Sequence, residues 1–223
     1  MRTPVVDYRK LRLHNLHTPE YSHLLLLLGW VGYFLMYTIT ETFIPAENCH
    51  VIHCWLDDVI PFLEIFVIPY VLWYLLIVVS LGYFALYNIE SFKKLQTYII
   101  ITQIIAMICY IAYPTRQDLR PESFERDNIF TRVVGFMYVF DTNTGVCPSL
   151  HCIGGFAIFF AAVDMPRFRT KGWIAFFLVF ALMICASTVF MKQHSIVDFC
   201  AALPVVAIGW LAVYLPAMLK ARK

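Results

Sequence analysis

Six apolar runs, separated by polar links, most strongly limit what this chain of 223 residues can fold into. An α-helix rises about 1.5 Å per residue, so roughly 20 apolar residues cross the ~30 Å hydrocarbon core of a bilayer. The runs cover residues 22–40, 59–86, 95–113, 149–165, 172–190 and 195–218. Hydrophobic residues make up 61% of the chain and charged residues 14%, whereas a soluble domain carries about 25% charged residues. The sequence therefore predicts an all-α integral membrane bundle of six helices, in one domain over residues 1–223.

The basic residues predict how this bundle is oriented. With both termini on one side of the membrane, twelve of the seventeen lysines and arginines fall on that side. They are Arg2, Arg9, Lys10, Arg12, Lys93, Lys94, Arg167, Arg169, Lys171, Lys220, Arg222 and Lys223. Because cytoplasmic segments carry the excess of basic residues, we predict that both termini are cytoplasmic. Residues 1–21 lack the small-residue cleavage site of a signal peptide, so we interpret them as a cytoplasmic tail.

Two polar segments on the opposite side are interpreted as loops. Residues 41–58 contain Cys49-His-Val-Ile-His-Cys54, which is too tightly spaced for a common structural zinc site. We expect either a small disulfide ring or unpaired thiols there. Residues 115–148 form the longest polar stretch, and a loop of this length is usually functional.

The second apolar run begins with Pro61, Glu64 and Pro69. Proline interrupts helices, so we expect the opening of this run to be a separate bent or interfacial segment. A carboxylate at such a depth normally has a partner. We interpret Glu64 as hydrogen-bonded to a neighbouring helix or to a hydrated interface.

His194 and Asp198 are a candidate catalytic pair at the link between the last two runs. Four residues apart, they lie on one face of a helix that begins here. A carboxylate in that position accepts the proton of one imidazole nitrogen and leaves the other free to attack or to take a proton. The same spacing also fits a plain hydrogen bond at a helix end, and the pair alone does not separate the two interpretations.

The six-span topology brings further polar residues to the same face of the membrane. The set consists of Arg116, Arg120, Ser149, His151, Lys192 and His194. Two histidines, a hydroxyl and three cations are what reaction at a phosphate ester requires. One histidine attacks phosphorus, the other protonates the leaving alcohol, and the cations hold the oxygens as charge spreads. Ser149 also stands at a predicted helix N-terminus, where backbone N–H groups favour an anion.

Three motifs resemble those of the type 2 phosphatidic acid phosphatase superfamily. Cys147-Pro-Ser-Leu-His151 resembles its Pro-Ser-Gly-His motif. The stretch from Ser187 to Asp198 resembles Ser-Arg-x5-His-x3-Asp, and Arg120-Pro resembles the end of Lys-x6-Arg-Pro. The resemblance covers residues 116–203, and the six-span layout agrees with the family fold. Each motif is weak alone, but three in order on one face are specific.

The resemblance implies metal-independent phosphoryl transfer through a phosphohistidine, without a cofactor. His194 would be the nucleophile and Asp198 would orient it. His151 would protonate the leaving group and then activate water. The phosphate would be bound by Ser149, Ser187 and Arg120.

Two cations of the family pattern are missing. The lysine of Lys-x6-Arg-Pro is replaced by Tyr113, and the arginine of the Ser-Arg pair by Thr188. Arg116 and Lys192 lie near these positions, so we expect them to bind phosphate instead. Leu150, where the family has glycine, also resembles the branch that contains inositol phosphorylceramide synthases, which pass a phosphoalcohol head group between lipids.

Three classes of function follow from these residues. The first, which we predict, is a lipid phosphate phosphatase in the cell membrane, with its site facing outward and a phosphomonoester or diphosphate lipid as substrate. The second is a head-group transferase that uses the same histidines with an alcohol acceptor. The third is a membrane scaffold or transporter, for which His194→Ala would leave function intact. No phosphate-binding glycine-rich loop or His-Glu-x-x-His motif is present, so nucleotide hydrolysis and zinc proteolysis have no support, and no nucleic-acid partner is expected.

Overall fold

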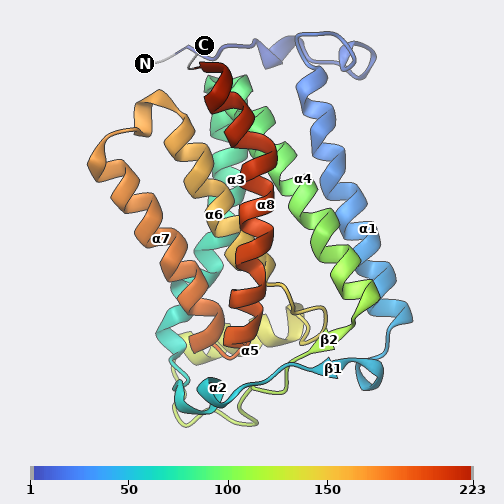
Figure 1. The fold of residues 1–223 in the computed structure, drawn as a ribbon, viewed down its shortest axis with the longest axis vertical. Helices are drawn as coiled ribbons and strands as arrows, with labels where there is room; N and C mark the ends of the chain where they lie inside the picture. The colour runs from blue at the N-terminus through green and yellow to red at the C-terminus, as the bar shows by residue number, and fades with distance from the viewer. Residues whose placement is uncertain (1–2, 222–223) are drawn as a thin grey trace.

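The computed structural model describes residues 3–221, so Arg2, Arg222 and Lys223 of the basic set lie outside the described residues. Figure 1 shows a bundle of long helices, with both ends of the described part of the chain at one end of the bundle. The α-helices within the described residues are α1 Leu28–Phe43, α2 Trp55–Val59, α3 Val67–Tyr87, α4 Ile89–Ala112, α5 Ile129–Phe140, α6 Leu150–Asp164, α7 Lys171–Phe190 and α8 Ile196–Ala221. The prediction of a mostly helical protein is confirmed.

Five helical segments within residues 3–221 are long and apolar enough to cross a membrane. These are Ser22–Phe43, Glu64–Tyr87, Ile89–Ala112, Lys171–Phe190 and Ile196–Lys220. They match five of the six apolar runs and indicate a multi-pass membrane protein. The remaining run forms α6, which has 15 residues and at about 1.5 Å per residue is shorter than the hydrocarbon core.

Helix α6 lies inside the bundle and packs against α3, α4, α7 and α8. Small residues allow these helices to approach: a methyl group on Gly155 would come within 3.5 Å of the Ala181 carbonyl of α7. Small side chains at such positions are typical of helix contacts in membranes. At the end near the termini, Lys94 of α4 forms an ion pair with Asp164 of α6 at 2.8 Å. Since His151 is the second residue of α6, this packing fixes the position of that histidine.

The start of the second run is a separate segment around Pro61, as predicted, whereas Pro69 lies in the first turn of α3. Helix α2 ends at Val59, and a short 3-10 turn over Glu64–Phe66 precedes α3. The Glu64 carboxylate accepts a hydrogen bond from Asn128 Nδ2 at 3.1 Å and lies 3.3 Å from Arg126. The expectation that Glu64 has a polar partner is confirmed.

A thin layer of short elements closes the end of the bundle opposite the termini (Figure 1). Strand β1, His50–Val51, pairs in parallel with β2, Thr115–Arg116, and α2 and α5 lie in the same layer. The sequence interpretation of residues 115–148 as a loop was wrong for α5. Asn128 caps this helix by accepting bonds from Phe130 N and Thr131 N, and its 12 residues are too few to produce the signal of a span.

The cysteines of the first polar segment are not joined. Across residues 3–221 all the cysteines are free thiols. Cys49 is buried, and Cys54 stands at the N-cap of α2, where its backbone N–H donates to Asp57 Oδ2 at 2.9 Å. Of the two alternatives for this segment, the structure has the unpaired thiols.

Candidate functional site

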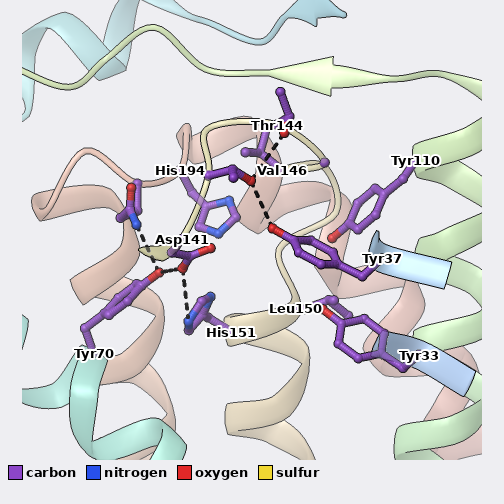
Figure 2. Close-up of a pocket in the computed structure, with 13 residues that line it drawn as sticks. Tyr33, Tyr37, Tyr70, Tyr110, Asp141, Thr144, Val146, Leu150, His151 and His194 are labelled. Carbon is purple, nitrogen blue, oxygen red and sulfur yellow. Dashed lines mark hydrogen bonds and ion pairs between the residues drawn. The ribbon is translucent and has the colours of Figure 1, made fainter. Parts of the chain in front are cut away.

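A cavity of about 420 Å³ lies at the end of the bundle opposite the termini. Side chains from α1, α3, α4, the start of α6 and the α7–α8 link line it, together with the segment 141–146. Figure 2 shows His151, Asp141 and His194 facing Tyr33, Tyr37 and Tyr110 across it. We call this space the histidine cavity, because both predicted catalytic histidines line it.

His194 and Asp198 form the predicted pair. His194 Nδ1 lies 3.1 Å from Asp198 Oδ2, and both side chains are buried. A proton on Nδ1 satisfies this bond, which leaves the Nε2 lone pair free for the cavity. Burial of the imidazole opposes protonation, but the hydrogen bond and charge of Asp198 outweigh it and raise the pKa of His194 above its ordinary value of 6.5.

The alternative interpretation of this spacing, a bond at a helix end, also holds. Asp198 Oδ2 accepts the backbone N–H of Ser195 at 3.0 Å, and the Ser195 hydroxyl accepts Val197 N at 3.1 Å. Ser195 thus caps the start of α8 through its hydroxyl, and Asp198 accepts back from the N–H of this cap residue. The same carboxylate oxygen therefore caps the helix and orients His194. The catalytic interpretation and the helix-end interpretation are thus compatible.

His151 faces His194 with ring centroids 5.8 Å apart. Its imidazole stacks on the ring of Tyr70 at 4.3 Å and lies against Trp73 at 4.4 Å. Its Nε2 is 4.0 Å from Asp141 Oδ2, which is too long for a hydrogen bond but within range of charge attraction. The two imidazoles are therefore in edge contact, and both line the histidine cavity.

Asp141 and Tyr70 are site residues that sequence reasoning missed. The Tyr70 hydroxyl donates to Asp141 Oδ2, Tyr74 donates to the same oxygen at 3.4 Å, and Gln193 Nε2 donates to Tyr70 at 3.3 Å. Tyr70 is hidden within an apolar run, and Asp141 is one of several acids in a polar stretch. The available signal was position, because Asp141 stands six residues before the Cys147-Pro-Ser motif.

The segment that carries Asp141 is held on several sides. Tyr37 of α1 hydrogen-bonds Thr142 at 2.9 Å, and the Tyr110 hydroxyl donates to the Pro148 carbonyl at 2.7 Å. Gly145 has φ +58°, and a Cβ there would lie 3.4 Å from the Tyr110 ring. Glycine adopts this left-handed conformation without the strain of a side chain. These contacts fix the segment and therefore the position of Asp141.

Ser149 and Ser187 lie beside the histidine pair but do not line the cavity. Both are fully buried. Ser149 N donates to the Asp198 carbonyl at 3.2 Å, which joins the starts of α6 and α8. The Ser187 hydroxyl donates to the Ile184 carbonyl of its own helix at 2.6 Å. In this structure Ser149 joins two helix starts and Ser187 bonds within α7, and neither lines the cavity.

Arg120 also lies behind the cavity wall. Its guanidinium donates to the carbonyls of Tyr138 at 2.8 Å and Asp141 at 2.6 Å, and its centre lies 4.6 Å above the Tyr138 ring. Burial lowers the pKa of Arg120 below its ordinary value, though not enough to discharge a guanidinium. The guanidinium therefore binds the C-terminal end of α5 and does not line the cavity.

The two expected replacement cations are engaged away from the cavity. Arg116, in β2, donates to the Ala46 carbonyl at 3.0 Å and lies 3.2 Å from Asp118 Oδ2. Lys192 Nζ donates to the carbonyls of Asp57 and Ile60, at 2.5 Å each. Both residues join the closing layer to the helices.

The lining of the histidine cavity is rich in hydroxyl groups. They belong to Tyr33, Tyr37, Tyr70, Tyr110, Thr142 and Thr144. Asp141, His151 and His194 are the ionisable groups besides the tyrosines, and no lysine or arginine of residues 3–221 lines the cavity. In that same range no cluster of three or more His, Cys, Asp or Glu residues is arranged to hold a metal ion. A bound anion would meet hydroxyl donors and imidazoles.

Comparison with protein-family models, curated proteins and solved structures finds no match for this chain.

Proposed function

We propose that this protein is a membrane enzyme that breaks a phosphate ester bond of a lipid through a phosphohistidine on His194. The single observation that carries this proposal is the His194–Asp198 pair facing His151 across one cavity. The three motifs that resemble the type 2 phosphatidic acid phosphatase superfamily support it further, and we propose membership of that family. The first candidate activity is a lipid phosphate phosphatase, with water as the final acceptor.

The residues of the cavity divide the reaction into two steps. In the first, His194 Nε2 forms a bond to phosphorus as the ester P–O bond breaks, and protonated His151 gives its proton to the leaving alkoxide. Asp198 holds the Nδ1 proton and stabilises the positive charge on the phosphorylated ring. In the second, neutral His151 takes a proton from water, whose oxygen displaces His194 from phosphorus. Both histidines then return to their starting states.

Asp141 assists the first step. A carboxylate 4.0 Å from His151 Nε2 favours the protonated imidazole, which is the form that can act as an acid. Tyr70 donates to that carboxylate and also stacks on His151, so it keeps the two groups facing one another. Asp141 is therefore a positioning residue, since it acts through His151.

The proposed topology has six spans, namely the five long apolar segments and α6. Both termini lie in the cytoplasm, and the histidine cavity lies at the outer face of the cell membrane. The basic residues near the described termini, on one end of the bundle, support this orientation. An epitope tag at the C-terminus is expected to bind antibody only after the cells are permeabilised. Labelling of intact cells would reverse the orientation.

A second candidate function, head-group transfer between lipids, is favoured by one observation. The cavity lining offers hydroxyls and imidazoles but no lysine or arginine from residues 3–221. A phosphomonoester carries a charge of about −1.5 to −2 at neutral pH, whereas a phosphodiester carries a single negative charge. A hydroxyl-rich lining suits the lower charge. In this reaction His151 would take the proton from a lipid alcohol instead of water.

Product analysis tests both candidates. The purified protein is incubated in detergent with phosphatidic acid, or with a phosphodiester lipid plus a lipid alcohol, and free phosphate and lipid products are measured together. Free phosphate indicates the phosphatase, and transfer of an intact head group indicates the transferase. Activity is expected to persist in EDTA, because the charges come from side chains. Loss of activity that magnesium or zinc restores would contradict the phosphohistidine mechanism.

The covalent intermediate provides a sharper test. With an activated aryl phosphate, His151→Ala is expected to accumulate acid-labile phosphate on the protein, because the leaving group needs no acid but the intermediate lacks its base. His194→Ala is expected to carry none, and Arg132→Ala, at an exposed ion pair with Asp127, serves as the control. Labelling of His194→Ala at the wild-type level would place the nucleophile elsewhere.

A further inference from the structure

A second cavity, of about 360 Å³, lies deeper in the bundle. Residues of α1, α3, α4 and α6 line it, and most of them are aliphatic or aromatic, including Trp30, Ile77 and Ile153. We call it the apolar cavity.

The apolar cavity continues the histidine cavity toward the middle of the bundle. Tyr33 and Leu150 line both spaces, and Figure 2 shows them at one side of the histidine cavity. On α6 the lining passes from His151 in the histidine cavity to Ala157 in the apolar cavity. Six residues of helix span about 9 Å. The two cavities therefore form a polar compartment near the closing layer and an apolar compartment toward the middle of the bundle. The His151 imidazole lies near the boundary between them.

Two polar groups in the apolar cavity have no hydrogen-bond partner among the described residues. They are the indole N–H of Trp73 and Oε1 of Gln103. Gln103 is only 7% exposed. Buried polar atoms in native proteins are normally paired, because an unpaired group loses its bonds to water. These two atoms therefore indicate a ligand that brings its own polar group into an otherwise apolar space.

The position of Trp73 depends on a glycine of α6. A Cβ on Gly154 would lie 2.7 Å from Trp73 Nε1, so only glycine leaves room for the indole as placed. The same indole lies against His151, with ring centroids 4.4 Å apart. Trp73 therefore touches the His151 imidazole and also lines the apolar cavity. A side chain in this position can contact the part of a lipid where the head group joins the hydrocarbon chain.

We infer that the apolar cavity binds one hydrocarbon chain of the substrate lipid while its phosphate lies in the histidine cavity. The ester or amide that joins chain and head group meets Trp73 and Gln103. The indole N–H donates to its carbonyl oxygen, and where the link is an amide, its N–H donates to Gln103 Oε1. This inference rests on the proposed function, because it uses the lipid phosphate assigned to the histidine cavity.

Chain-length preference tests the site by kinetics. Ile77 of α3 lines the cavity and is 5% exposed, whereas its neighbour Val78 is 68% exposed on the lipid-facing side. Ile77→Phe shortens the cavity and is expected to change the ratio of kcat/KM for long-chain and short-chain phosphatidic acids by about tenfold, in favour of the short chain. Val78→Phe adds the same ring outside the cavity and should leave this ratio at the wild-type value. An unchanged ratio in Ile77→Phe overturns the inference.

Photocrosslinking tests the site without turnover. The probe is a phosphatidic acid with a diazirine midway along its acyl chain, added to the full-length His194→Ala protein in lipid nanodiscs. Crosslinks are expected on the inward-facing residues of α1, α3, α4 and α6, and an excess of unlabelled phosphatidic acid should remove them. Crosslinks confined to residues that face the bilayer, and insensitive to that excess, overturn the inference.

The two experiments separate this inference from the proposed function. Crosslinks inside the apolar cavity of His194→Ala, together with no release of phosphate by the wild-type protein, would support a lipid-chain site and contradict the phosphatase. Phosphate release with crosslinks on the bilayer-facing surface alone would support the enzyme and contradict the chain site. Because the crosslinked protein keeps Ile77, this result does not depend on the folding of Ile77→Phe.

Discussion

The carboxylate of Asp141 lies 4.0 Å from Nε2 of His151, while the carboxylate of Asp198 lies 3.1 Å from Nδ1 of His194. Each histidine thus has its own acid, but the two pairs differ in geometry. Asp198 is in hydrogen-bond contact and fixes a tautomer, whereas Asp141 acts over a longer distance through its charge. In the proposed reaction Asp198 orients His194 for attack, and the charge of Asp141 favours the protonated form of His151 that donates.

Asp141→Asn is expected to lower kcat/KM for an alkyl phosphate lipid by on the order of tenfold, less than the 10²–10⁴-fold that proton transfer contributes in total. The effect should nearly vanish for an aryl phosphate, whose leaving group needs no proton. A purely structural role would lower both rates alike. Asp127→Asn, at an exposed ion pair with Arg132, is the matched control and should change neither rate.

His194→Ala is expected to abolish turnover, and Asp198→Asn to reduce it less, because the amide keeps the nucleophile and can still accept the Ser195 N–H. The pH profile gives the more specific readout. Asp198 raises the pKa of His194, so its neutralisation lowers that pKa, and the acid limb of kcat/KM should move to lower pH. A limb that stays in place or moves upward would show that the nucleophile does not depend on the Asp198 charge.

The apolar runs predicted most of the helices because a bilayer leaves few alternatives. Backbone groups in hydrocarbon must be satisfied within the helix, so run length and composition determine a span. Helix α5 has no such constraint: its 12 residues lie in the closing layer, and it starts with an Asn128 cap within a polar stretch. Local sequence gave no periodic signal long enough to find it.

The candidate site was predictable where its geometry is local. His194 and Asp198 are one helical turn apart, so their contact follows from spacing alone. The Asp141–His151 approach depends on how the segment 141–146 packs against α1 and α4, and no spacing rule contains that information. Lys192 shows the opposite case, since its proximity to His194 in sequence suggested a phosphate ligand while its side chain turns to the carbonyls of Asp57 and Ile60.

Asp57 is expected to stabilise the start of α8. Its carboxylate is 1% exposed and accepts bonds from Ser195 Oγ at 2.6 Å and Ile196 N at 2.9 Å. Asp57→Ala leaves these buried donors unpaired and should lower the free energy of unfolding by about 1–3 kcal/mol. Thermal unfolding in detergent measures the loss. Asp58→Asn, whose carboxylate meets His53 at the surface, is the neighbouring control and should have little effect.

The contribution of Asp57 should depend on pH in a defined direction. Burial alone would raise its pKa, but hydrogen bonds from Ser195, Ile196 and Cys54 lower it below the ordinary value of 3.8. Folding thus favours the ionised form. The stabilisation is fully present above pH 3.8 and is lost as the pH falls through the lower, folded-state pKa. The difference in Tm between wild type and Asp57→Asn should therefore be constant near neutral pH and shrink only in strong acid.

Substitutions of Arg116 and Lys192 test whether these cations bind phosphate, as the sequence predicts, or hold the closing layer, as their contacts indicate. As replacement cations they would bind phosphate, and either alanine variant would lower kcat/KM by on the order of 10²-fold, the scale for one preorganised donor. In the structure Lys192 binds two carbonyls and Arg116 binds Ala46 and Asp118. We therefore expect both variants to lower the Tm, while kcat/KM of the folded protein changes by less than about tenfold.

Measuring Tm and kcat/KM on the same preparations separates these outcomes. Arg132→Ala, an arginine of the same polar stretch with its own exposed ion pair, should leave both quantities unchanged. Lys192→Arg tests geometry, because a planar guanidinium is not expected to place its donors on both carbonyls as the ammonium does. A hundredfold loss of kcat/KM at an unchanged Tm would show that these side chains leave their carbonyl partners and reach the phosphate during catalysis. In that case the cation-poor lining of the histidine cavity would no longer favour a singly charged phosphodiester.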